Sequence, residues 1–292
     1  MKKVRVGIIG TGNVGTDLLI KVQRSKFLTC GIFTGIDPKS ESIKMADSMG
    51  VETSFESIHA IEAHPGLCDI VFDATSASFH LKHARILKKM GKYTIDLTPS
   101  HVGKMCIPVI NLMECLEESN VNLISCGGQA AVPIAYSIMK THPDTEYIEI
   151  VSSMASKSAG PGTRANIDEF TRINKEAILS FTDVPKAKSI FILNPADPPV
   201  YMNNTIYAKI EKPDINKIMN NVMSMARKIK CYVPGYDVVL GPVFENGRVT
   251  TMVKVIGLGD FLPKYAGNLD IISCAAIKVA EEYARRKVLR GK

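Results

Sequence analysis

The sequence has no tryptophan, no long apolar run and no pair of cysteines at C-x-x-C spacing. Because a helix needs about 20 mostly apolar residues to cross a bilayer, the second absence predicts a protein without membrane-spanning segments. The seven cysteines are an odd number, and no group of cysteines and histidines has the spacing of zinc ligands. We therefore expect free thiols in a reducing, cytoplasmic environment, with neither a disulfide framework nor a metal site.

Positive charge is in modest excess, because 36 lysines and arginines against 29 acidic residues give a formal net charge of +7. Much of this excess lies in the tail at residues 284–292 and in scattered lysines of predicted helix surfaces. These positions lack the interleaved aromatic residues of a nucleic-acid-binding surface. We interpret the charge as a solvated surface and expect no nucleic-acid partner.

The first 126 residues alternate between short β-branched runs and segments with helical spacing. This order is typical of a doubly wound parallel sheet. We therefore predict an α/β dinucleotide-binding (Rossmann) domain over residues 1–126. Its predicted strands lie at 4–10, 28–36, 68–74, 92–98 and 121–126, and its predicted helices at 14–25, 41–50, 78–91 and 111–120.

After residue 126 the pattern changes to longer strand-like runs. Asn246-Gly247 between the last two runs is a strong hairpin signal. We predict an α+β catalytic domain over residues 127–267, with a mixed, largely antiparallel sheet and helices on one face. A final amphipathic helix, at about 268–292, is expected to pack back on the first domain. The strand-like runs cover 146–156, 188–195, 200–210, 236–244 and 248–259, and helical patterns cover about 166–180 and 214–230.

The clearest motif is G-x-G-x-x-G at residues 10–15, between the first predicted strand and the first predicted helix. The first glycine permits a tight turn, the second lets the backbone approach a pyrophosphate, and the third allows close packing of helix on strand. The start of the helix faces the phosphate charge. We predict that the NAD-binding turn consists of Gly10, Thr11, Gly12, Asn13, Val14 and Gly15.

Asp37 lies at the predicted end of the second strand, about 20 residues after the glycines. A carboxylate at this place hydrogen-bonds the ribose hydroxyls of NAD and repels the extra phosphate of NADP. We therefore predict that Asp37 gives a preference for NAD. The alternative is a capping role before Pro38, and the nearby Lys39 and Ser40 can soften the discrimination.

Cys126 closes the predicted strand at 121–126, and Gly127 and Gly128 let the chain turn before a helical segment. The thiol is then expected at the start of a helix, where the helix dipole lowers a thiol pKa and favours the nucleophilic thiolate. The alternative is a small core residue, which is our interpretation of the other six cysteines. We predict that Cys126 is the catalytic nucleophile, that iodoacetamide labels it before the other thiols, and that neighbouring N–H groups form an oxyanion hole.

A thiolate beside a nicotinamide suggests that an aldehyde is oxidised through a thiohemiacetal to a thioester. The thioester then needs an acceptor. All six histidines lie at or before His142, so the later strands offer no histidine base. An acceptor that is itself a good thiol nucleophile, such as coenzyme A, needs less help from a base.

Seven segments resemble the acylating (CoA-acetylating) acetaldehyde dehydrogenases, the family that partners 4-hydroxy-2-oxovalerate aldolase. They occur in order along nearly the whole chain: IGTGNVGTDL, VFDATSA, IDLTP, SCGGQAAVP, SKSAGPGTRANIDEFT, NPADPP and YAGNLDI. The resemblance implies the fold shared with glyceraldehyde-phosphate dehydrogenase and NAD-dependent oxidation of acetaldehyde, or another short aldehyde, to acyl-CoA. It also implies homodimer contacts, an aldolase heteromer and a place in the cytoplasmic catabolism of aromatic compounds.

The resemblance also assigns site residues. It places the acyl-thioester cysteine at Cys126 and a later NAD contact at Asn268. On composition alone, the segment of the second NAD-binding loop is equally a plain glycine-proline connection. By the resemblance, that loop consists of Ser158, Ala159, Gly160, Pro161, Gly162, Thr163, Arg164, Ala165 and Asn166.

The chain departs from the family in two places. Asn203-Asn204 stands where members commonly have Arg-Asp, so a carboxylate proposed to assist proton transfer is missing. The segment between YVPGY and YAGNLD is shorter than in typical members, which bears on the usual partner interface.

Two other functions stay open from the sequence. One is a semialdehyde or phosphorylating dehydrogenase of the same fold, and the other is a non-catalytic protein that binds NAD and senses the cofactor ratio. The first needs anion-binding arginines in the second domain. Before the C-terminal helix, that domain offers Arg164, Arg172, Arg227 and Arg248.

Overall fold

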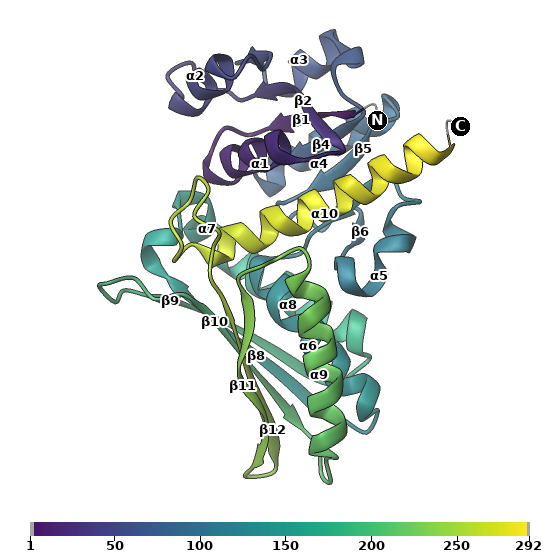
Figure 1. Cartoon of the computed structure of the whole chain (residues 1–292), viewed down its shortest axis with the longest axis vertical. Coiled ribbons are helices and arrows are strands. Elements are labelled where there is room, and N and C mark those ends of the chain that lie inside the picture. The colour runs from purple at the N-terminus through teal and green to yellow at the C-terminus, as the bar shows by residue number, and fades with distance from the viewer. Residues whose placement is uncertain (1–2, 291–292) are drawn as a thin grey trace. The chain divides into compact units, whose positions relative to one another are not determined.

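The computed structural model describes residues 3–290. The chain divides into two compact units (Figure 1), the first made of the residues up to Leu123 and from Ser273 onward, and the second of Ile124–Ile272. Residues 1, 2, 291 and 292, which the sequence analysis assigns to the first domain and its last helix, lie outside the described residues. Among the described residues, no helix is both long and apolar enough to cross a membrane.

Unit 1 is built on seven parallel strands in the order β3-β2-β1-β4-β5-β7-β6. The order reverses between β1 and β4, and doubly wound sheets bind ligands at the carboxyl ends of the strands at such a reversal. The predicted parallel sheet is therefore confirmed. The strands are β1 (Val4–Ile9), β2 (Leu28–Thr34), β3 (Thr53–Ser54), β4 (Ile70–Asp73), β5 (Tyr93–Asp96), β6 (Lys104–Met105) and β7 (Asn120–Asn122).

Helices connect these strands and cover the sheet. Ile9, Ile32 and Val71 from the strands share one buried cluster with Ile61 and Leu87 from two of the helices. All residues of β4 and β5 are buried, as expected of a parallel sheet that is covered on both faces. The helices are α1 (Asn13–Arg24), α2 (Glu41–Ser48), α3 (Ile58–Ala63), α4 (Ala77–Lys89), α5 (Pro108–Cys115) and the part of α10 (Gly267–Arg290) from Ser273 onward.

The C-terminal part of α10 packs within unit 1. Tyr283 stacks on Tyr93 of β5, with ring centroids 4.0 Å apart. Ser25, just after α1, donates a hydrogen bond from its Oγ to Glu281 at 2.6 Å. The end of the chain therefore belongs to the packing of the first unit.

Unit 2 holds a five-stranded sheet in the order β11-β12-β10-β8-β9, in which only β8 and β9 are parallel. Figure 1 shows α6, α8 and α9 on one side of this sheet. The predicted mixed, largely antiparallel sheet is confirmed. The elements are α6 (Cys126–Thr141), β8 (Tyr147–Ala155), α7 (Pro161–Ala165), α8 (Ile167–Thr182), β9 (Ala187–Asn194), β10 (Met202–Lys209), α9 (Ile215–Lys230), β11 (Tyr236–Glu245) and β12 (Arg248–Val255).

A two-residue turn joins β11 to β12. Its residues, Asn246 and Gly247, both have positive φ, 51° and 74°. This is the backbone of a type I′ turn, whose twist matches that of the paired strands. The predicted hairpin is confirmed.

Candidate active site

The glycine motif forms the turn between β1 and α1 in unit 1. Gly10 has a φ of 110°, and a Cβ there would lie 2.6 Å from the carbonyl oxygen of Ala74, so only glycine fits. A Cβ at Gly15 would lie 1.8 Å from the carbonyl oxygen of Gly10. Helix and strand approach this closely only because neither residue has a side chain.

The start of α1 is open to a ligand. Gly12 precedes the helix and makes no side-chain capping bond, and a Cβ there would meet no protein atom within 4 Å. Asn13 and Val14 are the first residues of α1, and the first N–H groups of a helix lack intrahelical acceptors and attract anions. The turn therefore has the space and the donors that a pyrophosphate needs.

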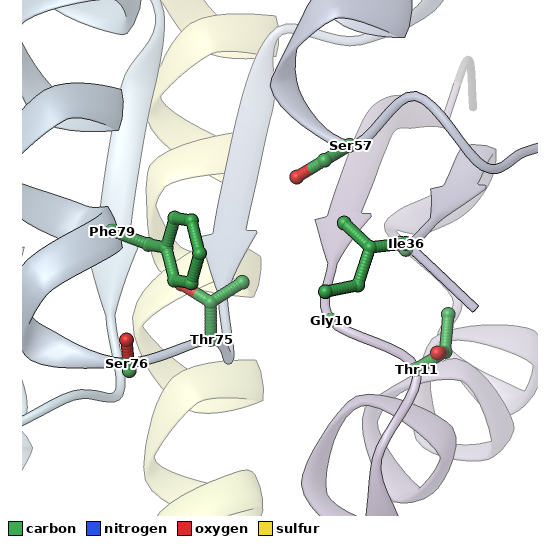
Figure 2. Close-up of a pocket in the computed structure, with 8 residues that line it drawn as sticks. Gly10, Thr11, Ile36, Ser57, Thr75, Ser76 and Phe79 are labelled. Atoms are coloured by element: carbon green, nitrogen blue, oxygen red, sulfur yellow. The ribbon is translucent and has the colours of Figure 1, made fainter.

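A pocket of about 240 Å³ opens beside this turn. Figure 2 shows the Phe79 ring and the Ile36 side chain facing each other across it. Phe79 is 48% exposed and Ile36 is 71% exposed, so the protein leaves both apolar side chains uncovered at the pocket. The pair can hold a flat ring such as adenine between them. The pocket is lined by Gly10, Thr11, Gly35, Ile36, Ser57, Thr75, Ser76 and Phe79.

A larger pocket of about 810 Å³ shares Ile36, Ser57 and Phe79 with the first and extends to Lys82 and His59. Unit 1 thus offers room for a nucleotide at the carboxyl ends of β1, β2 and β4. These lining residues were not predicted from the sequence. An isoleucine shortly after a predicted strand and a phenylalanine at the start of a predicted helix are common in cores as well, so no local pattern marks them.

Asp37 does not end β2, contrary to the prediction. The strand ends at Thr34, because the chain turns at Gly35, and Asp37 follows on the exposed surface. Its Oδ1 accepts a hydrogen bond from the N–H of Lys39 at 2.9 Å. The residue next to it, Ile36, lines the pocket. Recognition of the ribose by Asp37 stays a prediction.

A buried cluster of acids and histidines supports one wall of the smaller pocket. Asp73, the last residue of β4, accepts hydrogen bonds at its Oδ2 from His80 and His83, both at 2.8 Å. Burial alone would raise the pKa of Asp73, but the two histidines outweigh it and hold the pKa well below its usual range. Asp73 Oδ1 accepts the hydroxyl of Thr75 at 2.5 Å, so the cluster orients a residue that lines the pocket.

In unit 2, Cys126 is itself the first residue of α6, which corrects the predicted secondary structure. The expected strand at 121–126 ends at Asn122, and Gly127 and Gly128 lie in the first helical turn and not before it. Ser125 is the N-cap, and its Oγ accepts the N–H of Gly128 at 2.9 Å. The thiol therefore lies at a helix start, as predicted, but the helix begins about one turn earlier in the sequence than predicted.

The turn before α6 is held in a strained conformation by its surroundings. Ile124 is buried and has a φ of 65°, a left-handed value that β-branched residues rarely adopt. Ser125 donates its hydroxyl to Asn174 Oδ1 at 3.2 Å, and Asn174 Nδ2 donates to Ser189 at 2.9 Å. Strain of about 1–3 kcal/mol persists only where packing fixes the backbone. This buried network therefore fixes the direction in which Cys126 points.

The two glycines after Cys126 let the helix start lie against its neighbours. A Cβ at Gly127 would lie 2.6 Å from Ser152 Oγ and 3.0 Å from the ring of Phe191. A Cβ at Gly128 would lie 2.8 Å from Asn174 Oδ1. The first turn of α6 therefore lies against β8 and β9 through Gly127, and Cys126 is half-buried.

Burial raises the pKa of the Cys126 thiol to about 12, although hydrogen bonds from the N–H groups of Gly127 and Cys126 act to lower it. The predicted low pKa of Cys126 is therefore wrong. Cys231 is exposed whereas Cys126 is half-buried, so we now expect iodoacetamide to label Cys231 before Cys126. An oxyanion hole needs N–H groups directed at the aldehyde oxygen, so its formation beside Cys126 stays a prediction.

The segment assigned to the second NAD-binding loop is largely helical and not an irregular loop. Ser158 ends a short 3₁₀ helix, and α7 begins three residues later at Pro161. Arg164 fastens the segment, because its Nε donates to the carbonyl of Ala159 at 3.0 Å and its Nη2 to that of Ser156 at 2.9 Å. Gly160 precedes α7, which consists of Pro161, Gly162, Thr163, Arg164 and Ala165.

The two asparagines that the resemblance assigns to NAD differ in their surroundings. Asn166 is the residue before α8, makes no capping bond with its side chain, and donates from Nδ2 to the carbonyl of Gly162 at 2.8 Å. Asn268, in the first turn of α10, is buried, and its Oδ1 has no hydrogen-bond partner within the described part of the chain. Such an atom is expected to bind a ligand or water.

Comparison with known proteins decides the family. Residues 126–263 match the family model described as "Prokaryotic acetaldehyde dehydrogenase, dimerisation", and residues 5–118 match "Semialdehyde dehydrogenase, NAD binding domain". An acetaldehyde dehydrogenase of Pectobacterium atrosepticum is 54% identical over 282 residues, which are 96% of this chain and 95% of the relative. The chain belongs to the acetaldehyde dehydrogenase family.

Other matches agree with membership of the acetaldehyde dehydrogenase family. A relative of that name from Spirochaeta aurantia is 49% identical over 97% of this chain and 96% of its own. Among solved structures, aspartate semialdehyde dehydrogenase II of Vibrio cholerae aligns with a TM-score of 0.63 over 98% of this chain and 99% of the other. Its identity is only 14%, so that likeness concerns the fold alone. The predicted family and NAD-binding domain are confirmed, and the roles of individual residues stay predictions.

Proposed function

We propose that this chain oxidises acetaldehyde, or another short aldehyde, to acyl-CoA with NAD, through a thioester on Cys126. One observation carries the proposal: a half-buried cysteine begins α6, with two backbone N–H groups directed at its sulfur. The choice of acetaldehyde as substrate comes from the names of the relatives. The open turn at Gly12 has the space that NAD needs.

The sulfur of Cys126 forms a bond to the aldehyde carbon, and backbone N–H groups stabilise the charge that develops on the oxygen. The thiol proton passes to the aldehyde oxygen. NAD held at the glycine turn would supply the hydride acceptor, and loss of a hydride from the carbon and of the hydroxyl proton to solvent converts the adduct to a thioester. The thiol of coenzyme A then attacks the thioester carbon, the bond to Cys126 breaks, and the proton of coenzyme A returns to the cysteine sulfur. The enzyme is thus regenerated with a free thiol.

The arginines of unit 2 favour an uncharged aldehyde and a thiol acceptor over anionic substrates. Arg172 pairs with Glu169 at 2.6 Å, and Arg248 stacks on the ring of Tyr207. Arg164 is engaged with backbone carbonyls. Three of the four arginines that unit 2 offers before the C-terminal helix are therefore engaged with other groups.

We expect Asp37→Ser to raise the ratio of activity with NADP to activity with NAD, because removal of the carboxylate relieves repulsion of the ribose phosphate. The kcat/KM for each cofactor, measured on wild type and variant, gives that ratio. Glu41→Ser, at an exposed acid a few residues later, is the matched control. An unchanged ratio in Asp37→Ser would show that Asp37 serves only to bond the N–H of Lys39.

We further propose that the chain forms a homodimer and docks an aldolase. The matched dimerisation model spans the sheet of unit 2, whose face opposite the helices carries half-buried Val151, Tyr207 and Met252. Co-expression with a 4-hydroxy-2-oxovalerate aldolase from the same source should yield one heteromer by size-exclusion chromatography with light scattering. Separate elution of the two proteins at micromolar concentration would show that this chain works without an aldolase.

A further inference from the structure

Three buried polar side chains on the helix-covered face of the unit 2 sheet lack hydrogen-bond partners. Ser152 on β8, Asn204 on β10 and Thr251 on β12 are each 0% exposed. Among residues 3–290, the hydroxyl oxygens of Ser152 and Thr251 and both polar atoms of the Asn204 amide have no hydrogen-bond partner. Buried polar atoms are nearly always paired, so four unpaired atoms on three strands require an explanation.

The strand register brings these residues together. Asn204 is the direct partner of Ser152 across β10 and β8. Thr251 is the partner of Ile206, two residues from Asn204 and on the same face. Side chains in such direct and diagonal positions lie about 5–8 Å apart at Cβ. We call Ser152, Asn204 and Thr251 the buried polar cluster.

The buried polar cluster adjoins the start of α6. Ser152 Oγ lies so close to Gly127 that a Cβ on that glycine would be 2.6 Å away. Gly127 directly follows Cys126, and its N–H is one of the two directed at the sulfur. Ser152, one member of the buried polar cluster, is therefore next to the helical turn that carries the nucleophile.

Packing alone does not explain polar residues at these positions. Apolar side chains occupy the neighbouring buried positions of the same strands and face, among them Ile150, Met154, Ile206 and Val253. An unpaired buried hydroxyl or amide destabilises a fold relative to an apolar group of the same shape. A polar cavity of several donors and acceptors is the usual environment of an internal water molecule.

We propose that Ser152, Asn204 and Thr251 hold internal water that relays the proton of Cys126 during addition to the aldehyde. The proposal rests on the proposed role of Cys126 as nucleophile. As the sulfur–carbon bond forms, the water accepts the thiol proton and donates one of its own to the former carbonyl oxygen. The S–H bond and the C=O π bond break, the S–C and O–H bonds form, and the water is unchanged overall.

A neutral relay suits the surroundings of Cys126. Among the described residues, no charged side chain contributes to the pKa of this thiol, which burial raises to about 12. A free thiolate is therefore rare at neutral pH. Addition in which the proton moves together with bond formation avoids a buried, unpaired charge. Asn204 is a neutral amide. By the resemblance to the family, a carboxylate is expected at this position.

The test compares variants of the buried polar cluster with the same substitutions at positions away from both faces of the unit 2 sheet. Thr251→Val and Asn204→Leu remove polar atoms and keep the branched shape of the side chain, and Thr29→Val on β2 and Asn220→Leu on the exposed side of α9 are the matched controls. We expect kcat for acetaldehyde to fall by about 10²-fold in both cluster variants, the lower scale of proton-transfer assistance. In the cluster variants the KM for NAD should not rise and the melting temperature should not fall. The kcat of the control variants should stay within about twofold of the wild-type kcat.

Thr251→Val is the decisive variant, because it disturbs the packing less than Asn204→Leu does. A kcat at the wild-type level in Thr251→Val overturns the proposal. Asn204→Asp gives a second readout. Burial should raise the pKa of the introduced carboxyl toward neutrality, so this variant should gain up to about 10²-fold in rate near neutral pH and then reach a plateau. Identical pH profiles of Asn204→Asp and wild type would likewise contradict the relay.

Alkylation of Cys126 by iodoacetamide in a Cys231→Ser background needs no aldehyde, NAD or coenzyme A. We expect Thr251→Val to slow it about tenfold at neutral pH, because the held water no longer assists loss of the proton. Slowed alkylation in a protein that forms no acyl-CoA would reject the proposed function but support the water site. Acyl-CoA formation with unchanged alkylation would reject the water site alone.

Discussion

Replacement of Cys126 by serine should lower acyl-CoA formation by at least about 10³-fold, because removal of a nucleophile costs several orders of magnitude in rate. Serine preserves the size of the side chain and the start of α6, so the helix and its Ser125 cap should remain. The hydroxyl, however, is a far weaker nucleophile and acyl carrier than sulfur. Acyl-CoA formed per enzyme at saturating NAD, acetaldehyde and coenzyme A is the quantity to measure.

NAD binding provides the internal control for Cys126→Ser. The glycine turn belongs to unit 1, whereas Cys126 belongs to unit 2, so the dissociation constant for NAD should stay within about twofold of wild type. Cys231→Ser, at an exposed thiol, is the matched control for the loss of a sulfur atom. Acyl-CoA formation by Cys126→Ser at the wild-type rate would refute the thioester mechanism.

Gly12→Val should weaken NAD binding by about 10²-fold without unfolding the protein. The backbone at Gly12 is extended, with a φ of −79°, and a Cβ there meets no protein atom within 4 Å. Valine therefore fits the fold but occupies the space that the second glycine of the motif leaves for the pyrophosphate. A displacement of about 1 Å is enough for an effect of this size. Fluorescence titration with NADH and a thermal melt measure the two quantities.

Two other glycines serve as controls for Gly12→Val. Gly66 also has open space around its Cβ position but lies away from the motif, so Gly66→Val should leave NAD binding unchanged. Gly15→Ala should lower the melting temperature as well as the affinity, because its Cβ would lie 1.8 Å from the Gly10 carbonyl. Wild-type affinity for NAD in Gly12→Val would show that the nucleotide does not bind at this turn.

Most of the fold could be predicted because its signals are local. The parallel sheet follows from alternating strand and helix patterns, and the β11–β12 hairpin from Asn246-Gly247, whose positive φ values only a few residue types tolerate. The two-residue strands β3 and β6 are too short to show any period. Their positions depend on pairing with β2 and β7, which only the folded chain supplies.

The site was predicted less completely, because its properties depend on residues distant in sequence. The start of α6 at Cys126 depends on Ser125, whose cap bond and contact with Asn174 no local pattern shows. The pKa of the thiol depends on burial, not on the helix start alone. The buried polar cluster is invisible in sequence, since it exists only through the pairing of three separate strands.

The most direct test of the central claim is the NADH absorbance that develops when the purified protein is mixed with acetaldehyde and NAD, with and without coenzyme A. We predict sustained turnover with coenzyme A and a single burst of about one NADH per active site without it, because the thioester on Cys126 then has no acceptor. Replacement of coenzyme A by phosphate should give no sustained turnover. Turnover with phosphate would show a phosphorylating enzyme, and no NADH in any mixture would show a protein that binds NAD without this chemistry.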